Sequence, residues 1–205
     1  MGLFDNVVGT LKSGVTREIK KQVQGAVDGA VKEVIKKADS KKEKFVFQSL
    51  PSSVTELNAL PEATLDSAFK TAALTIAVLC NYEKDPEETI AMLDVLKGPE
   101  PTSNLEKSQI KDRLTGKYYK TFSFFEGATV DNSYTPNTPY TITVYQTAHS
   151  FTEENWATMY VKSSGADSPR PIKLRKKPSS GQWFLIGVPP CLADIRIPKS
   201  EDKWA

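Results

Sequence analysis

The sequence predicts an α+β fold in which an N-terminal amphipathic helix precedes three helices packed on an antiparallel β-sheet of about five to six strands. Helical periodicity dominates residues 1–38 and 64–116, whereas β-branched and aromatic residues dominate residues 118–197. A short polar run separates the first helix from the rest. We therefore expect an amphipathic helical extension (1–38), a polar linker (39–44) and an α+β globular domain (45–205).

The N-terminal segment carries two apolar stripes when it is placed on a helical wheel. The first covers an arc of roughly 140° at about 100° per residue, and the second is rotated from it by roughly 120°. This offset predicts a helix that bends near Gly14 or Gly25, or one that presents two faces. The expected membrane or partner face consists of ten apolar residues: Leu3, Phe4, Val7, Val8, Leu11, Val15, Ile19, Val23, Val27 and Val31.

The polar side of this segment is basic. Residues 1–44 hold ten lysines and arginines against six acids, a net charge of +4 in a chain whose net charge is +2. Lys12, Arg17, Lys20 and Lys21 form a basic flank beside the apolar stripe, a pattern suited to anionic lipid headgroups. The opening Gly-Leu-Phe-Asp also resembles short amphibian membrane-active peptides.

Residues 1–38 leave four interpretations open: docking on an anionic membrane surface, docking on a partner protein, packing on their own domain or in a homo-oligomer, or disorder. No apolar run approaches the ~20 residues that span a bilayer, and lysines and glycines interrupt a would-be secretion signal. Asn6 replaces the Ser or Thr of a myristoylation signal. Interleaved acids disfavour nucleic acid as a partner. We expect a cytoplasmic protein, peripheral at the inner membrane face.

The globular domain is expected to begin with an edge strand at residues 45–50, followed by a connector at residues 52–61. A first helix is predicted to start at Thr64, whose hydroxyl can cap its amides, and to run to Tyr82. This helix is apolar nearly all round. It is therefore expected to be the central buried helix.

Two further helices carry clear start and stop signals. Asp85 as N-cap and Pro86 at the first position predict the start of the second helix, which Gly98 ends. Ser103 or Asn104 can cap the third, which is expected to end at Gly116. Three consecutive helices therefore fill the first half of the domain.

The second half is predicted to be a meander whose turn at residues 179–181 forms a hairpin. One face of this sheet is expected to pack on the first helix. The predicted strands span residues 118–125, 140–145, 156–162, 172–176, 183–186 and 194–197.

Two segments carry a resemblance to a known family. Ser163–Pro171 (SSGADSPRP) and Gly181–Leu185 (GQWFL) resemble an uncharacterised bacterial family of domains of unknown function, over most of residues 45–205. That resemblance implies no known activity. The order of helices before strands is also similar to the cone-shaped nuclear-transport-factor-like fold, whose concave sheet often holds a ligand. It implies a small-ligand-binding or hydrolytic domain as an alternative function.

One polar loop is a candidate ligand site, with Ser164, Asp167 and Arg170 as its residues. Arg170 lies between two prolines, which restrict its backbone. A fixed arginine can clamp a carboxylate or phosphate. The interpretation we favour is a hairpin loop in which Asp167 and Arg170 satisfy turn amides and each other.

The chemistry-bearing residues do not form a recognisable catalytic set. His149 stands alone in a loop without a nucleophile motif, and Cys80 and Cys191 lie far apart without metal-like spacing. The sequence predicts no catalytic residue, metal ligand or cofactor, and an enzyme is the less favoured class. We expect a non-enzymatic interaction or scaffold protein. Its N-terminal helix is expected to dock it to a membrane surface or a protein assembly.

Overall fold

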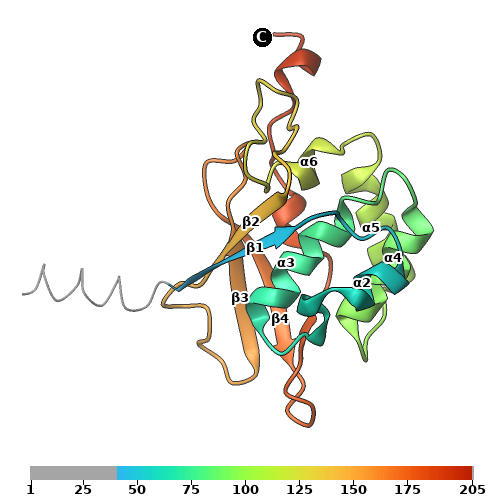
Figure 1. Ribbon diagram of the computed structural model, residues 1–205, viewed down its shortest axis with the longest axis vertical. Helices are drawn as coiled ribbons and strands as arrows, with labels where there is room; N and C mark the ends of the chain where they lie inside the picture. Colours follow the sequence, from blue (N-terminus) through green and yellow to red (C-terminus); the bar gives the residue numbers. More distant parts are fainter. Residues whose placement is uncertain (1–40, 205) are drawn as a thin grey trace, which may run out of the picture. The chain divides into compact units, whose positions relative to one another are not determined.

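Five antiparallel strands pair in chain order to form one sheet, and the helices gather on one of its sides (Figure 1). The computed structural model describes residues 41–204, so the predicted amphipathic helix and its basic flank lie outside the described residues. The strands are β1 (Lys42–Phe47), β2 (Tyr140–Tyr145), β3 (Trp156–Val161), β4 (Arg170–Lys176) and β5 (Trp183–Leu185). The helices are α2 (Val54–Ala59), α3 (Ala68–Leu79), α4 (Pro86–Lys97), α5 (Asn104–Leu114) and α6 (Tyr119–Phe122), with 3-10 turns η1 (Pro61–Thr64), η2 (Pro190–Leu192) and η3 (Lys199–Glu201).

Helix α3 is the centre of the hydrophobic core. Every residue of this helix except Lys70 is buried, as its apolar composition predicts. It contacts all five strands, and α4 and α6 pack against it from other directions. In Figure 1 it lies between the sheet and the group formed by α2, α4 and α5. The α+β class and the packing of the sheet on this helix are therefore confirmed, although only α3 of the three expected helices lies across the sheet.

The start signals of α4 and α5 and the stop signal of α4 act as predicted, whereas α5 ends at Leu114, two residues before the expected Gly116. The Asp85 carboxylate accepts a hydrogen bond from the backbone N–H of Glu88, and Pro86 occupies the first turn. Gly98 ends α4 with a positive φ of 59°. Ser103 and Glu106 cap α5 reciprocally, each side chain accepting from the other residue's backbone N–H.

The start of α3 differs from the expectation. Thr64 does not cap it, because Leu65 adopts a left-handed conformation with a φ of 53° and separates η1 from the helix. Ser67 is the N-cap instead, and its hydroxyl accepts from the N–H of Phe69. The prediction of an N-cap at Thr64 is therefore wrong, because the N-cap of α3 lies three residues later, at Ser67.

Two segments expected to be irregular are regular. Helix α2 occupies the expected connector, because Ser53 caps it by accepting from the N–H of Glu56. Strand β1 begins at Lys42, since Lys42–Lys44 pair with β2 although their composition is that of a linker. Short polar segments of this kind carry little hydrophobic periodicity, and partners elsewhere in the fold decide their conformation.

The expected strand at residues 118–125 is wrong. This segment forms α6 and adjoining turns, in which the hydroxyls of Thr121 and Ser123 donate to the carbonyls of Tyr118 and Lys120. Alternating aromatic residues suit a strand, but these hydroxyls satisfy local carbonyls instead. The aromatic rings still find apolar partners, as Tyr119 shows by stacking on Tyr134 at 5.8 Å between ring centroids.

The expected strand at residues 194–197 is also wrong. Asp194 has a positive φ of 50°, which interrupts an extended run. The N–H of Arg196 donates to the carbonyl of Gly165 in the loop between β3 and β4, outside the sheet ladder. The sheet of the described residues therefore has five strands, the lower end of the expected range.

A buried ion pair joins α4 to α5. The Lys97 ammonium, only 5% exposed, donates to the Glu106 carboxylate at 2.8 Å. Partial burial works to raise the pKa of Glu106, but hydrogen bonds from Lys97 and Ser103 outweigh it and hold that pKa below its ordinary value of 4.5. The carboxylate thus completes a capping box and neutralises a buried lysine.

We predict that Glu106→Gln lowers the free energy of unfolding by about 1–3 kcal/mol near neutral pH, because it leaves the Lys97 charge without its counter-ion. Because the pKa of Glu106 is lower in the folded than in the unfolded state, its ionised carboxylate stabilises the fold at a pH above the ordinary pKa. This stabilisation is lost as the pH falls through the ordinary pKa and then through the lowered one. The variant should therefore show a weaker loss of stability on acidification. Urea unfolding across pH measures both effects.

The matched control is Glu87→Gln, which removes an exposed acid from the first turn of α4. Its expected cost is about 0.3–1 kcal/mol from the helix dipole alone. Equal losses in the two variants would show that the Lys97 pair contributes nothing of its own.

Candidate functional site

The sheet has two unlike faces. Along β3 the side chains of Ala157, Met159 and Val161 are buried, so alternation places Trp156 and Tyr160 on the opposite face. In Figure 1 the labelled helices lie on the other side of the sheet from this face. We call it the open face and define it by Lys42, Lys44, Val46, Thr143, Tyr145, Trp156, Thr158, Tyr160, Lys162, Lys173, Arg175 and Phe184.

The open face is basic. Strands β2 to β5 contain no aspartate or glutamate, and β1 contains only Glu43, which alternation places on the opposite face. The basic residues of the open face are Lys42, Lys44, Lys162, Lys173 and Arg175. Lys44 forms an ion pair with Glu126 at 2.8 Å, and Arg175 lies 4.0 Å from Glu100. Positive charge is therefore concentrated on one side of the sheet.

Aromatic side chains lie between these charges. Strand register places Tyr145 opposite Tyr160 and Trp156 opposite Arg175. The Lys162 ammonium lies 5.2 Å from the centre of the Tyr145 ring, and the Arg175 guanidinium lies 5.1 Å from that of Trp156. Each such contact contributes about 0.5–1 kcal/mol at an exposed site. The face thus combines cations with aromatic surface.

Three hollows are lined in part by open-face residues. One, of about 400 Å³, lies by Thr143, Tyr145 and Lys162 and reaches the loop at residues 123–128. Another, of about 260 Å³, lies by Trp156, Thr158 and Lys173 and reaches the loop at residues 149–153. The third is a cleft of about 250 Å³ at the β5 edge.

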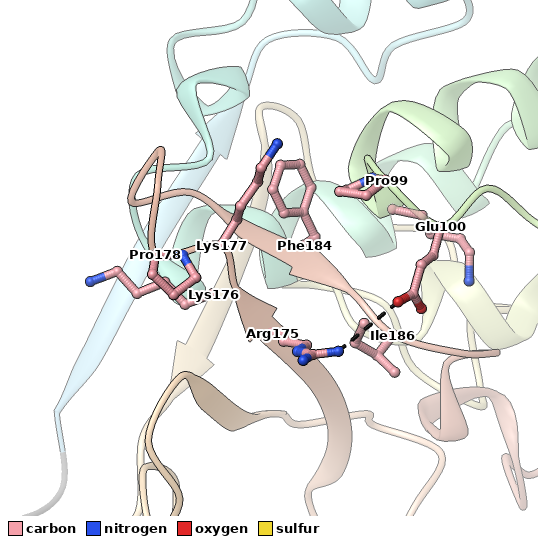
Figure 2. Close-up of a pocket in the computed structure, with 9 residues that line it drawn as sticks. Pro99, Glu100, Arg175, Lys176, Lys177, Pro178, Phe184 and Ile186 are labelled. Atoms are coloured by element: carbon pink, nitrogen blue, oxygen red, sulfur yellow. Dashed lines mark ion pairs between the residues drawn. The ribbon is translucent and has the colours of Figure 1, made fainter.

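The cleft at the β5 edge lies between β4, β5 and the end of α4 (Figure 2). Its apolar lining consists of Pro99, Pro178, Phe184 and Ile186, and its charged lining of Lys97, Glu100, Arg175, Lys176 and Lys177. Figure 2 shows the Arg175 guanidinium directed at Glu100 across the mouth. Such a lining suits a group with an apolar body and an anionic end.

Gly98 allows the end of α4 to approach β5 this closely. Its φ of 59° and ψ of −111° are open to glycine alone, and a Cβ there would lie 2.4 Å from the ring of Phe184. The phenyl ring therefore occupies the space of the missing side chain. This contact positions Phe184 as a wall of the cleft.

The three residues expected to form a ligand loop are not brought together as a clamp. Asp167 forms an ion pair with Arg196, and the Arg170 guanidinium donates to the carbonyl of Asp194 at 2.7 Å. The expected contact between Asp167 and Arg170 is therefore replaced by contacts to the C-terminal segment. Ser164 lines the hollow beside Lys162, and its hydroxyl donates to the carbonyl of Ser123 at 3.3 Å.

Three candidate nucleophiles, Ser150, Cys80 and Cys191, are hydrogen-bonded to backbone groups or protonated. The Ser150 hydroxyl, beside His149, donates to the carbonyl of Thr158 at 2.6 Å and accepts from the N–H of Thr147. Burial raises the pKa of Cys191, and also that of the thiol of the partly buried Cys80, to about 12. Neither sulfur is therefore a thiolate at neutral pH.

The described residues, 41–204, contain neither a metal-binding cluster nor a membrane-spanning helix. These residues hold no cluster of three or more His, Cys, Asp or Glu side chains able to bind a metal ion. No helix of this part of the chain is long and apolar enough to cross a bilayer.

Sequence reasoning missed the open face. Its charge signal was present, because β2 to β5 hold four basic and no acidic residues. All four lie in β4, however, where alternation turns only Lys173 and Arg175 to the open face, and strand pairing is needed to bring Lys42, Lys44 and Lys162 onto the same surface.

Comparisons with known proteins give one match. A family model described as Domain of unknown function (DUF6935) matches residues 49–199, which covers the helices, four of the five strands and the cleft. No curated protein and no solved structure matches the chain.

We predict that Gly98→Ala lowers the free energy of unfolding by about 2–5 kcal/mol, through backbone strain together with the clash against Phe184. Gly116→Ala is the matched control, because Gly116 has a φ of 67° with no atom within 4 Å of its would-be Cβ. Its expected cost is about 1–2 kcal/mol from the left-handed backbone alone. Chemical denaturation of both variants measures the difference.

A double variant isolates the steric part. In a Phe184→Ala background, Gly98→Ala should cost no more than Gly116→Ala, because the ring is gone. An unchanged cost in that background would mean that the ring does not set the need for glycine.

Proposed function

Because the chain belongs to the family described as Domain of unknown function (DUF6935), a description that names no activity, we propose its function from its own residues. The protein is an interaction module, and its residues 1–38 bind an anionic membrane surface. Docking on a protein assembly is the competing outcome of the test below.

The observation that carries this proposal is the continuity of positive charge from the N-terminal segment into the sheet. Residues 1–44 have a net charge of +4, and their last lysines, Lys42 and Lys44, lie on the open face of β1. The described chain therefore begins at the basic side of the folded unit. An anionic surface that attracts residues 1–38 also attracts this side of the sheet.

The chemistry of docking follows from the sequence pattern. An amphipathic helix of this kind lies in the plane of the interface and buries its apolar stripe among the acyl chains. Basic residues near an anionic membrane contribute about 1 kcal/mol each. Lys12, Arg17, Lys20 and Lys21 are placed in the sequence to make that contribution.

The alternative of a ligand-binding or hydrolytic domain has less support. Hydrolysis needs an activated nucleophile or a metal-bound water. Within the described residues the Ser150 hydroxyl is held by backbone groups, and the two thiols are protonated at neutral pH.

We predict that the triple variant Phe4→Glu, Val8→Glu and Leu11→Glu loses binding to vesicles of phosphatidylcholine mixed with phosphatidylserine. Three carboxylates on the apolar stripe cannot be buried among acyl chains without a large desolvation penalty. Flotation of the full chain with these vesicles measures the loss, and light scattering run beside it reports any change in oligomer size.

The matched control places the same three charges on the polar side, as Asn6→Glu, Thr10→Glu and Ser13→Glu. Binding should weaken here only through the altered net charge. Equal binding by all three proteins would contradict membrane docking through the stripe, and a change of oligomer size confined to the apolar-stripe variant would assign the segment to a protein assembly.

A further inference from the structure

We propose that the open face of the sheet is a second membrane contact, on which phosphate groups of anionic lipids bind between Lys162, Lys173 and the aromatic side chains. This proposal rests on the proposed function, because residues 1–38 bring the unit to the lipid surface. It adds to that function a second lipid-binding surface, which lies on the folded unit of residues 41–204.

The first support is charge complementarity. Lys162 and Lys173 are exposed, and neither has an acidic partner within residues 41–204. Lys42 and Lys44 extend the same surface to the edge strand β1. Lys44 pairs with Glu126 and Arg175 lies near Glu100, so the cations of this face without an acidic partner among residues 41–204 are Lys42, Lys162 and Lys173. These three charges are complementary to a sheet of lipid phosphates.

The second support is the aromatic content. Trp156 is 36% exposed, whereas Tyr160 farther along β3 and Tyr145 opposite it on β2 are partly buried. Tryptophan and tyrosine prefer the headgroup level of a membrane, where one end of the ring is wet and the other is apolar. Together with the lysines, these rings match the composition of a membrane-facing surface.

The third support is shape. Lys162 and Lys173 each line a hollow, of about 400 Å³ and about 260 Å³ respectively. Spaces of this size suit small polar groups such as lipid headgroups. A phosphate entering either hollow meets an ammonium group at its wall, together with one carboxylate: Glu126, which is paired with Lys44, in the first hollow and Glu153 in the second.

The same contacts favour lipid over single-stranded nucleic acid. Nucleic-acid-binding sheets stack bases on the faces of their aromatic rings. On the open face, Lys162 lies over the ring of Tyr145 and Arg175 over that of Trp156, so cations occupy the ring faces that bases would need. The cations themselves remain able to reach phosphate.

The test is charge reversal on the open face of the full chain. Lys162→Glu combined with Lys173→Glu should weaken binding to vesicles of phosphatidylcholine mixed with phosphatidylserine by at least roughly 30-fold, the loss expected from removing two lysine charges alone. The matched control, Lys107→Glu with Lys111→Glu, makes the same change of charge on the exposed side of α5. It should weaken binding by no more than about threefold, because charges farther than a Debye length from the lipid are screened.

Thermal unfolding checks that the open-face variant and the α5 control are both folded. If the open-face variant is not folded, the double variant Lys162→Gln with Lys173→Gln takes its place. Equal weakening by the reversal and its control, or none, would overturn the proposal. A second result would also overturn it: a single-stranded oligonucleotide binds the unaltered protein, its binding is lost in the charge-reversal variant, and vesicle binding by that variant is unchanged.

The outcomes separate this proposal from the proposed function. Loss of vesicle binding in the apolar-stripe variant, together with normal binding in the open-face variant, supports docking through residues 1–38 and rejects the open-face contact. The reverse pattern rejects the N-terminal anchor and leaves the sheet as the lipid-binding surface.

Discussion

The burial of α3 is the constraint on which the rest of the fold depends. A helix that is apolar nearly all round has to be enclosed on every side, because each large side chain left in water forfeits about 1.5–3 kcal/mol. The sheet covers one side, and α4 and α6 pack from other directions. The capped starts of α4 and α5 and the turn at Leu65 direct the chain around this helix.

The same constraint accounts for the unequal faces of the sheet. All five strands turn one set of side chains towards the α3 side, and this set is apolar except at strand ends, where Glu43, Arg170 and Lys176 lie. Alternation then leaves the other set directed away from the core, where no packing requirement selects its residues. That freedom allows cations and aromatic rings to gather there, and it makes the open face the part of the described chain whose composition packing does not explain.

Much of the fold could be predicted, and the errors have physical causes. The apolar pattern of α3 and the caps at Asp85 and Ser103 depend on neighbouring residues alone, so the sequence displays them directly. Residues 118–125 carry a strand-like alternation, yet the hydroxyls of Thr121 and Ser123 satisfy local carbonyls. The open face could not be predicted for a different reason. Cross-strand register, which no local pattern encodes, places Lys162 over Tyr145 and Arg175 over Trp156.

The last strand of the sheet is tied to the start of α3. The N–H of Trp183 donates to the carbonyl of Leu65, and the carbonyl of Trp183 accepts from the Thr71 hydroxyl. These two groups would otherwise lie along a free sheet edge, ready to pair with a strand of another molecule. At the opposite edge, β1 carries Lys42 and Lys44, whose charges repel a second copy. Both edges of the described sheet are thereby guarded against pairing with a strand of another molecule.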